Sequence, residues 1–539
     1  MGPIFVKVMN MPTAMTPLPR RLSIAGWFVV ILVAGVALRL ALAYVVFPSQ
    51  GFASDLEQFR SWSVSLAQSG PGSFYHNTTG ANYPPGYMYV LWALGDLGGP
   101  IGSLLGISAA SGTLLLLKLP AIAADAAIAV LLYHVATSWF GGRAGLMAAA
   151  LYLFVPVTWY DSALWGQVDA VGSLLMLAAL VALVDGWSEP ATVLAVLSVL
   201  VKPQDAVCLV VVVPVLVRRH LLRVGTGPQP DLGARMAAVN SRLGGLLRDQ
   251  GPIRLGTSLA LGALAGIALL VPFDIESLAP ASLSNLPVIG QVAGLISLFG
   301  SAAGQFDVLS ANAFNGWALV GPDPLSSIAG SGGTWTSDSL TVIAGITAVQ
   351  LGAGLLVLVG LLVVGGLLLR EGRLPIFLAF AVTAFAFYAV PTRVHERYLF
   401  AFFPVGALLS AGFLGGWLVY LVTGALNAVN LHAVLGSPNA IGGFPAGSGG
   451  FGGGLRGGFG GGGPGGGFGG GSPAAGGFGG GVSSINLPLV DLARSEPIVF
   501  AVALGQTVAF AVLLIAWLVV AFGPLLRSRT IPESETAHA

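Results

Sequence analysis

The sequence has few charged residues and a single cysteine. Only 8% of its 539 residues are Asp, Glu, Lys or Arg, whereas soluble domains carry about 25%. A chain with 55% hydrophobic residues and a mean hydropathy of +0.86 cannot cover itself with a water-soluble surface. The formal net charge of +1 shows no basic excess and so argues against nucleic acid as a partner. The lone Cys208 excludes an internal disulfide.

Long apolar segments are present instead. Arg20 and Arg21 precede an apolar stretch from about Leu22 to Phe47, which is long enough to cross a bilayer core of about 30 Å. Signal-peptide cores are shorter, about 7–15 residues. We therefore expect an uncleaved first helix whose N-terminus lies in the cytosol.

The positive-inside rule gives the remaining segments a direction. The segment 218–254 carries seven arginines against two acids and is expected to be a cytosolic loop. The run 398–432 is too long for one span and has Gly412 near its middle, so we expect two short helices there. The result is an all-α, polytopic bundle of about twelve helices with both ends in the cytosol. After the first helix they lie at about 108–139, 144–159, 164–186, 190–201, 206–217, 255–272, 341–369, 375–391, 398–432 and 497–523.

The predicted organisation has three parts. Residues 1–435 form a membrane module with two large outer loops, 48–107 and 273–340, the first carrying helices along the membrane interface. Residues 436–495 are expected to be a disordered outer loop, because Phe-Gly-Gly repeats dominate 442–481 and glycine-rich chain cannot repay its ordering entropy. Binding of a partner through the phenylalanines is the alternative. Residues 496–539 supply a last helix and a cytosolic tail.

Polar residues collect on one predicted face of the membrane. Ionisable groups in or beside membrane helices cost roughly 2.5–3.5 kcal/mol each, so they tend to mark function. Separate parts of the sequence place such residues at outer helix ends or in outer loops: Asp55, Glu57, Tyr83, Asp161, Gln167, Asp169, Lys202, Gln204, Asn312, Asn315, His395, Glu396 and Arg397. This convergence predicts a site on the outer face.

The residue types indicate a chemistry. A loop carboxylate can act as general base toward a hydroxyl, which is worth roughly 10²–10⁴ in rate. Lys202, Arg393 and Arg397 are cations that could hold the phosphate of a membrane lipid. Tyr83 and Trp165 could stack on a sugar ring, although interfacial aromatics are also expected as belt residues.

The ordered motifs resemble the GT-C glycosyltransferases over about residues 20–435. The matching segments are Ser54-Asp55-Leu56 with Phe59 and Trp62, Tyr83-Pro84-Pro85-Gly86-Tyr87, Trp165-Gly166-Gln167-Val168-Asp169, Val201-Lys202-Pro203-Gln204, Asn312-Ala313-Phe314-Asn315-Gly316-Trp317 and Val394-His395-Glu396-Arg397-Tyr398. Together they look like the bacterial relatives of GPI mannosyltransferase II and of dolichyl-phosphate-sugar transferases. The resemblance implies an inverting transferase in a bacterial inner membrane, with an outward-facing site. It would use a polyprenyl-phosphate sugar, most simply mannose, with Asp55 as catalytic base and no required cofactor.

Each residue also has a simpler explanation. Asp55 could cap an interfacial helix, and Gln167 and Asp169 could only join helices. Lys202 could extend to the headgroups, and Pro203 could merely break a helix. His395 and Glu396 could form a structural pair. Arg39, deep in the first helix, is expected to be a buried tether.

Other functions stay open at this stage. A transporter or flippase for a lipid-linked glycan is the main alternative; it predicts ionisable residues through the midplane and broken helices repeated in two halves. A noncatalytic scaffold would leave the polar face unexplained. No His, Asp or Glu spacing demands a metal, although a carboxylate pair with Mg²⁺ or Mn²⁺ stays possible. The acceptor could be a glycan, a lipid or a protein.

Overall fold

The structure, a computed structural model, describes residues 22–78, 80–222, 251–319, 335–412, 416–436 and 482–528. It confirms the predicted all-α class. The helices are α1 (Ile24–Ala41), α2 (Ala53–Ser69), α3 (Phe74–Asn77), α4 (Pro85–Leu105), α5 (Ala109–Leu116), α6 (Leu119–Phe140), α7 (Gly142–Phe154), α8 (Pro156–Trp159), α9 (Asp169–Val184), α10 (Ser188–Val201), α11 (Leu209–Leu216), α13 (Gly251–Leu270), α14 (Ile289–Ala303), α15 (Ala348–Leu369), α16 (Arg373–Ala389), α17 (Phe402–Gly412), α18 (Gly416–Leu435), α19 (Val490–Ala493) and α20 (Glu496–Ser528). Two strand pairs, β1 (Gln50–Gly51) with β4 (Ser483–Ser484) and β2 (Thr341–Ile343) with β3 (Ile346–Thr347), are the only sheet in the described residues.

Seven described helices are long and apolar enough to cross a membrane, or eight if the bent pair at 142–165 counts as one span. The chain is therefore an integral membrane protein. Five shorter apolar helices of 10–17 residues lie among them, so the predicted number of about twelve is not established. Residues 85–105, which we expected to lie within an interfacial loop, form one of the seven candidate spans.

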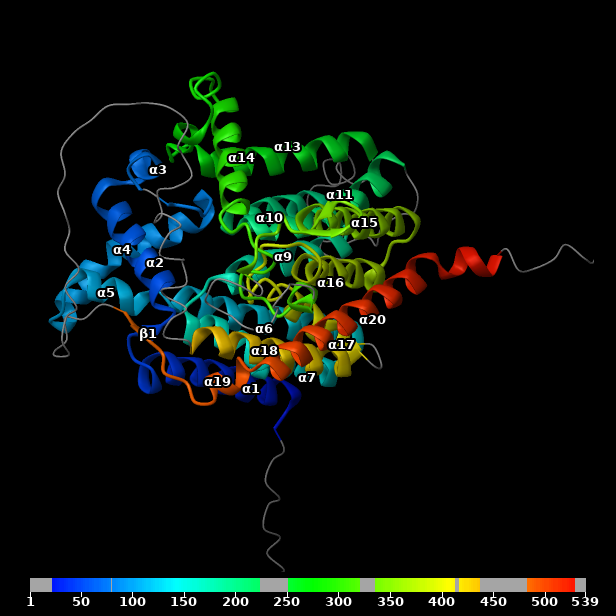
Figure 1. The fold of residues 1–539 in the computed structure, drawn as a ribbon, viewed down its shortest axis with the longest axis horizontal. Coiled ribbons are helices and arrows are strands. Elements are labelled where there is room, and N and C mark those ends of the chain that lie inside the picture. Colours follow the sequence, from blue (N-terminus) through cyan, green and yellow to red (C-terminus); the bar gives the residue numbers. More distant parts are fainter. Residues whose placement is uncertain are drawn as a thin grey trace, which may run out of the picture.

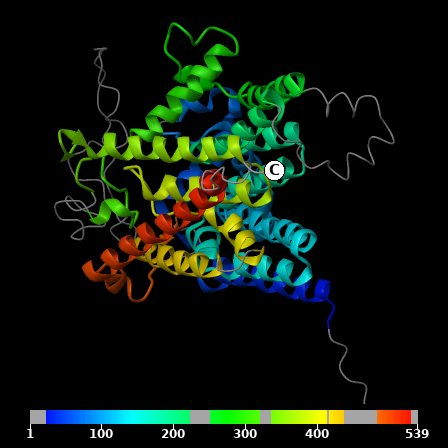
Figure 2. The same cartoon turned by 90° about the vertical axis from the view of Figure 1, so that its right-hand side faces the viewer.

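Helix α16 lies at the centre of the bundle and is buried along most of its length. Figure 1 shows α2, α4 and α5 grouped at one end of the molecule, with α20 extending away at the other. Figure 2 shows α15 and α20 crossing the turned face in front of the remaining helices. The loop that leaves α16, residues 390–401, thus starts from a rigid, fully packed support.

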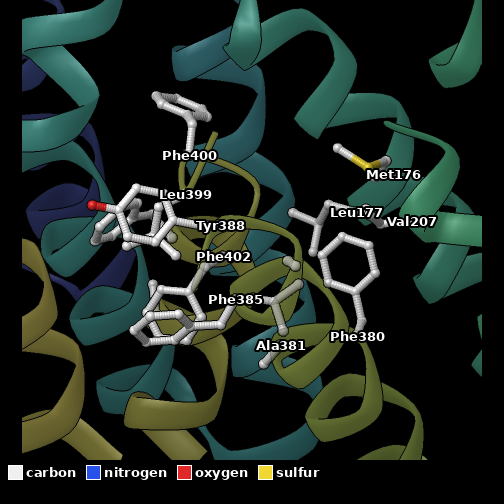
Figure 3. Packing of buried hydrophobic residues seen from close by; sticks show 14 of the residues in the cluster. Met176, Leu177, Val207, Phe380, Ala381, Phe385, Tyr388, Leu399, Phe400 and Phe402 are labelled. Atoms are coloured by element: carbon white, nitrogen blue, oxygen red, sulfur yellow. The ribbon is translucent and has the colours of Figure 1, made fainter. Parts of the chain in front are cut away.

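The core around α16 is dense with aromatic side chains. Figure 3 shows Phe380 and Ala381 beside Leu177 of α9. On the other side, the rings of Phe385 and Phe402 lie 5.4 Å apart. Aromatic pairs of this kind contribute about 0.5–1.5 kcal/mol each beyond their buried area. This packing fixes α16 against α9 and α17.

The run 398–432 is split into two helices, as predicted. Helices α17 and α18 pack against each other, with the rings of Phe402 and Tyr420 6.4 Å apart. The chain therefore reverses between them. Asn427 and Asn430, near the end of α18, donate to the carbonyl oxygens of Glu396 and Asn312. The last turns of α18 thus lie beside the predicted outer loops.

The chain breaks a second time after α6, where the helical segments 142–154 and 156–165 are bent relative to each other. Gly141, between α6 and α7, has a φ of 94°. At Gly145 a Cβ atom would meet Thr137 Oγ1 at 2.0 Å, so only glycine lets α6 and α7 approach so closely. Pro156, which lacks an N–H, coincides with a 50° bend before the π-helix η3 (Tyr160–Trp165).

Arg39 tethers this bend, as expected. Its Nε donates to Asp125 at 2.7 Å, and its terminal nitrogens donate to the Leu153 carbonyl and to Thr158 Oγ1. Asp125 accepts two further hydrogen bonds, from Tyr152 and Ser162. The network is fully buried, and it holds the helix break that leads directly to Trp165 and Gln167.

Arginines at the ends of the predicted cytosolic loop are paired. Arg218 and Arg219 contact Glu371 between α15 and α16. Arg254 contacts Glu189 at the start of α10. Both acids lie at helix ends on the side predicted to face the cytosol. The rest of this loop, residues 223–250, lies outside the described residues.

The end of the predicted glycine-rich loop is docked on the bundle. Residues 482–495 carry β4, which pairs with β1, and α19. His432 of α18 contacts the Tyr160 hydroxyl through Nδ1 and the Pro488 carbonyl through Nε2. Residues 437–481, on which the prediction of disorder mainly falls, lie outside the described residues.

Candidate active site

A cavity of about 810 Å³ opens where the predicted outer loops meet. Its walls come from the start of α2, the loop before α4, the segment after η3, the end of α10, the region between α14 and α15, the loop after α16, and side chains of α14, α15 and α16. Nine of the predicted site residues line it: Asp55, Tyr83, Gln167, Lys202, Gln204, Asn312, His395, Glu396 and Arg397. Segments more than 300 residues apart in sequence therefore share one concave surface.

Asp55 lies in the first turn of α2, which Trp165 anchors. The Phe52 N–H donates to the Trp165 carbonyl at 3.1 Å, and the two rings stack with centroids 4.5 Å apart. Gly166 has a φ of 88°, and a Cβ atom there would meet Leu56 at 2.5 Å. Glycine is thus needed for this loop to approach α2. The approach places the side chains of Trp165 and Gln167 beside the Asp55 carboxylate.

The Asp55 carboxylate is held through one oxygen. Trp165 Nε1 donates to Oδ2 at 2.8 Å, and Gln167 Nε2 donates to the same atom. Arg397 Nη2 lies 3.9 Å from it. None of the described residues donates a hydrogen bond to Oδ1, and the side chain keeps 18% of its surface exposed. One oxygen therefore orients the group, and the other is free to accept a proton.

Lys202 and Tyr83 form a second set of contacts, around Gln167. Helix α10 ends at Val201, before Pro203, and this leaves Lys202 extended toward the cavity. Its Nζ donates to Gln167 Oε1 at 3.0 Å and to Asp169 Oδ2 at 2.8 Å. The Tyr83 hydroxyl donates to the same Gln167 oxygen at 3.2 Å. Gln167 therefore connects Lys202 and Tyr83 to Asp55.

The third part of the site is the loop after α16. The backbone of His395 forms isolated β-bridges with the backbone of Ala311 and Asn312. Arg397 Nη1 donates to Glu396 Oε1 at 2.9 Å, and the guanidinium lies 5.4 Å from the Trp165 ring. Arg397 is thus held between two carboxylates, Asp55 and Glu396, and an aromatic ring.

Burial and charge shift the ionisation of this loop. Burial, and then the positive charges of Arg397 and Lys202, hold the pKa of His395 well below its ordinary value, so the imidazole is neutral at neutral pH. Burial raises the pKa of Glu396, although Arg397 opposes that shift. Burial alone would lower the pKa of Arg397, but the Asp55 and Glu396 carboxylates raise it. The guanidinium therefore stays charged.

Four predicted residues lie away from the cavity wall. Glu57 points along α2 to Arg60, and its side chain is 45% exposed. Asn315 is fully buried and bonds to the backbone of Tyr388 and Trp317, a structural role. Asp161 is buried, and no described residue hydrogen-bonds its carboxylate. Asp169 lies behind the wall and acts on the cavity through Lys202 and Gln204. Helix periodicity explains Glu57: it lies two residues from Asp55, on a different side of α2.

The sequence motifs missed part of the wall. Amide and aromatic side chains that also line the cavity are Gln58, Asn82, Gln305, Phe306 and Trp335. Asn82 directly precedes the Tyr83 motif, and Gln58 lies one turn after Asp55, so both could have been predicted from their position beside motif residues. Gln305 and Trp335 lie outside the motifs, before and after the one at Asn312–Trp317. Phe299, Ala302, Val349, Ala353 and Phe387, from α14, α15 and α16, add an apolar side.

Within the described part of the chain, no group of three or more His, Cys, Asp or Glu side chains is arranged to hold a metal ion. The acidic residues at the cavity are instead paired with cations. The structure therefore adds no support for the divalent ion that the sequence left open.

No model of a known protein family matches the chain, and no curated protein matches it in sequence. Among solved structures, it is similar to the archaeal oligosaccharyltransferase AglB from Archaeoglobus fulgidus, in complex with an inhibitory peptide and a dolichol-phosphate. The identity is 15% and the TM-score 0.36, over 75% of this chain and 51% of that one. The chain thus spans about half the length of the oligosaccharyltransferase. It is also similar to ArnT from Cupriavidus metallidurans bound to undecaprenyl phosphate, with 13% identity and a TM-score of 0.40 over 95% of this chain and 82% of that one.

Both solved structures are distant from this chain, at 15% and 13% identity. With TM-scores below 0.5, they describe what the chain is like and assign it no function.

Proposed function

We propose that this protein is a membrane glycosyltransferase with Asp55 as general base. It transfers a hexose, mannose in the first instance, from a polyprenyl-phosphate donor to an acceptor hydroxyl, with inversion at the anomeric carbon. The site faces outward from a bacterial inner membrane. The observation that carries the proposal is the Asp55 carboxylate: Trp165 and Gln167 hold one oxygen, and the other faces a cavity that also contains Arg397 and Lys202.

The reaction follows from this arrangement. Asp55 Oδ1 accepts the proton of the acceptor hydroxyl as that oxygen attacks the anomeric carbon. The bond from this carbon to the phosphate oxygen breaks, and its electron pair leaves with the phosphate. A phosphate leaving group needs charge neutralisation more than a proton donor. Arg397 and Lys202 supply that positive charge from the cavity wall.

The two cations are balanced before any donor binds. Lys202 is paired with Asp169 at 2.8 Å, and Arg397 with Glu396 at 2.9 Å. Such pairing prevents two buried charges from lying uncompensated in an empty site. A donor phosphate would share these cations with their carboxylates, so the remaining N–H groups of Lys202 and Arg397 would bind it. We infer that the pairs orient the cations in advance.

The apolar side of the cavity fits the prenyl chain. It is formed by side chains of three helices, including Phe299 of α14, Ala353 of α15 and Phe387 of α16. The outer surfaces of α14 and α15 expose aliphatic side chains such as Ile296 and Leu358, as expected for helices that face lipid. A lipid tail could therefore lie along this side with its phosphate at Arg397.

The test is an assay of purified protein with a panel of polyprenyl-phosphate sugars carrying mannose, glucose or arabinose. We expect transfer to an added acceptor, or slow hydrolysis, for one of the sugars. Asp55→Asn should abolish the activity in protein that elutes as a single folded species. Movement of intact lipid-linked glycan across vesicles without cleavage would instead support the transporter alternative. No cleavage of any donor would refute the proposal.

A further inference from the structure

The cavity has a side that the donor would not use. The ionic residues around Asp55 would contact the reacting sugar and its phosphate, and the apolar helices would contact the lipid. The remaining side consists of Asn82, Gln305, Phe306, Asn312 and Trp335, which we term the amide–aromatic wall. Because an acceptor must lie beside Asp55 and away from the donor lipid, this wall is the surface left for it.

The amide groups of the wall are partly unused. Asn82 Nδ2 donates to Gln305 Oε1 at 3.2 Å, but the buried Asn82 Oδ1 accepts no hydrogen bond from any described residue. Trp335 Nε1 donates to Asn312 Oδ1 at 2.9 Å, which leaves Asn312 Nδ2 as a donor without a described acceptor. One acceptor and at least one donor therefore remain for a ligand, and neither is charged.

Aromatic rings accompany these amides. The Phe306 ring meets Trp335 edge to face at 6.1 Å and His395 at 4.9 Å. The cation on this side, Arg393, is already neutralised by Asp338 at 2.6 Å and Asp307 at 2.9 Å. The wall thus offers apolar rings and neutral hydrogen-bonding groups, and none of its described residues provides an unpaired cation to recognise an anion.

The wall is joined to the catalytic residues on two sides. Asn82 directly precedes Tyr83, whose hydroxyl bonds to Gln167, and Gln167 bonds to Asp55. Asn312 pairs with His395, two residues before Arg397. The wall is therefore connected both to Asp55 and to the loop that carries Arg397.

We propose that the amide–aromatic wall is the acceptor subsite and that it binds a neutral saccharide. Sugar hydroxyls both donate and accept hydrogen bonds, which matches the unused Asn82 and Asn312 groups. Sugar C–H faces pack on aromatic rings such as Phe306. A peptide acceptor would expose backbone groups in fixed rows. An anionic sugar would place its charge beside Arg393, which two carboxylates, Asp338 and Asp307, already neutralise. The role of this saccharide as acceptor rests on the proposed function, but its binding to the wall can be tested without the donor.

The experiment measures binding by saturation-transfer NMR on the full chain in nanodiscs. Three probes are neutral disaccharides: methyl α-mannobioside, methyl β-cellobioside and methyl β-lactoside. The fourth is an acidic analogue that carries one glucuronic acid, and the fifth is a Ser/Thr octapeptide. We expect at least one neutral disaccharide to bind, and the acidic analogue and the peptide not to bind. Asn82→Ala and Gln305→Ala should each weaken binding about tenfold, the loss of roughly one hydrogen bond. Gln68→Ala, which changes an exposed amide on α2 outside the cavity, is the matched control.

Two outcomes would overturn the acceptor proposal: binding of the peptide in preference to every disaccharide, or disaccharide binding that Asn82→Ala and Gln305→Ala leave unchanged. Absence of any disaccharide binding to the wild-type protein would also overturn it. A separate measurement, hydrolysis of polyprenyl-phosphate mannose without acceptor, tests the proposed function. If no donor is cleaved but a neutral disaccharide binds, the proposed function fails and the saccharide subsite stands.

Discussion

The substitution Asp55→Asn removes the proposed base and keeps the hydrogen bonds that hold the side chain in place. Asn has the shape of Asp, and its side-chain oxygen can still accept hydrogen bonds from Trp165 Nε1 and Gln167 Nε2. Its amide nitrogen would then occupy the position of Oδ1, where it cannot take a proton. We expect turnover to fall by roughly 10²–10⁴, or about 3–5 kcal/mol of barrier.

The same change should leave the fold nearly intact. It removes the negative charge that Arg397 approaches at 3.9 Å, but Arg397 keeps its hydrogen bond to Glu396. Asp55→Ala is less informative, since it deprives two donors of their acceptor and so adds a desolvation cost of about 1–3 kcal/mol for each.

The assay is single-turnover transfer from the labelled donor, alongside thermal unfolding in the same detergent. Glu57→Gln is the control, because Glu57 is on the same helix but pairs with Arg60 outside the cavity. We expect that variant to keep wild-type turnover, as exposed ion pairs contribute little. An Asp55→Asn enzyme with turnover within about threefold of the control would refute Asp55 as the base, since general-base catalysis is worth far more.

Four further predictions concern the donor cations, the Arg39 network, the glycine-rich segment and His395. Arg397→Ala and Lys202→Ala should raise the apparent KM for the lipid-linked sugar, or lower turnover sharply, because each removes a cation beside the donor phosphate; an effect confined to acceptor KM would contradict this donor role. Asp125→Asn should destabilise the protein by about 3–5 kcal/mol in a detergent melt, since it leaves Arg39 buried without its counter-charge; an unchanged melt would show that the network is not needed. Deletion of Gly447–Gly481 should leave the extracted protein folded by size-exclusion chromatography, because Gly436 already lies against Leu487 and Val490; aggregation would indicate that the segment contributes to the fold. Because the folded-state pKa of His395 is lowered, the unfolded chain binds its proton more readily, so stability should fall as pH drops below about 6.5. His395→Gln should remove this pH dependence, which amounts to about 1.4 kcal/mol of stability at pH 5.5, and parallel pH profiles for the two proteins would contradict it.

Hydropathy and charge asymmetry predicted the membrane bundle because both report the energy of transfer into lipid, which depends on composition more than on packing. The break at 398–432 was predictable for the same reason: its length exceeds one span, and glycines lie where the chain must turn. The number of spans was not predictable, because Asp169–Val184, Ser188–Val201, Ile289–Ala303 and other short apolar helices are below the length that composition alone can assign.

The cavity residues were partly predictable because they lie at helix ends. A helix that ends at Val201 before Pro203 places Lys202 at its terminus, and the polar residues after α16 lie at the end of a fully buried helix. Side-chain direction was harder to predict. Glu57 lies two residues after Asp55, and Asn315 three residues after Asn312, yet Glu57 points along α2 to Arg60 and Asn315 points into the protein. A one-dimensional motif cannot separate them, since two or three residues on a helix or loop can reverse the direction of a side chain.

The sequence did not predict that each cation would be paired with a carboxylate. From the sequence, Lys202 and Arg397 were expected only to be cations that could hold a lipid phosphate. In the structure each cation has its own carboxylate, Asp169 and Glu396, and Asp55 adds a further negative charge. In the proposed site, a donor phosphate would therefore be bound by oriented N–H groups rather than by excess positive charge. Such hydrogen bonds are stronger in a cavity that excludes water than in bulk water, because the local dielectric constant is lower. For the same reason, a neutral wall beside this balanced group favours a neutral acceptor: an anionic one would bring a charge that no described side chain on that wall is free to compensate.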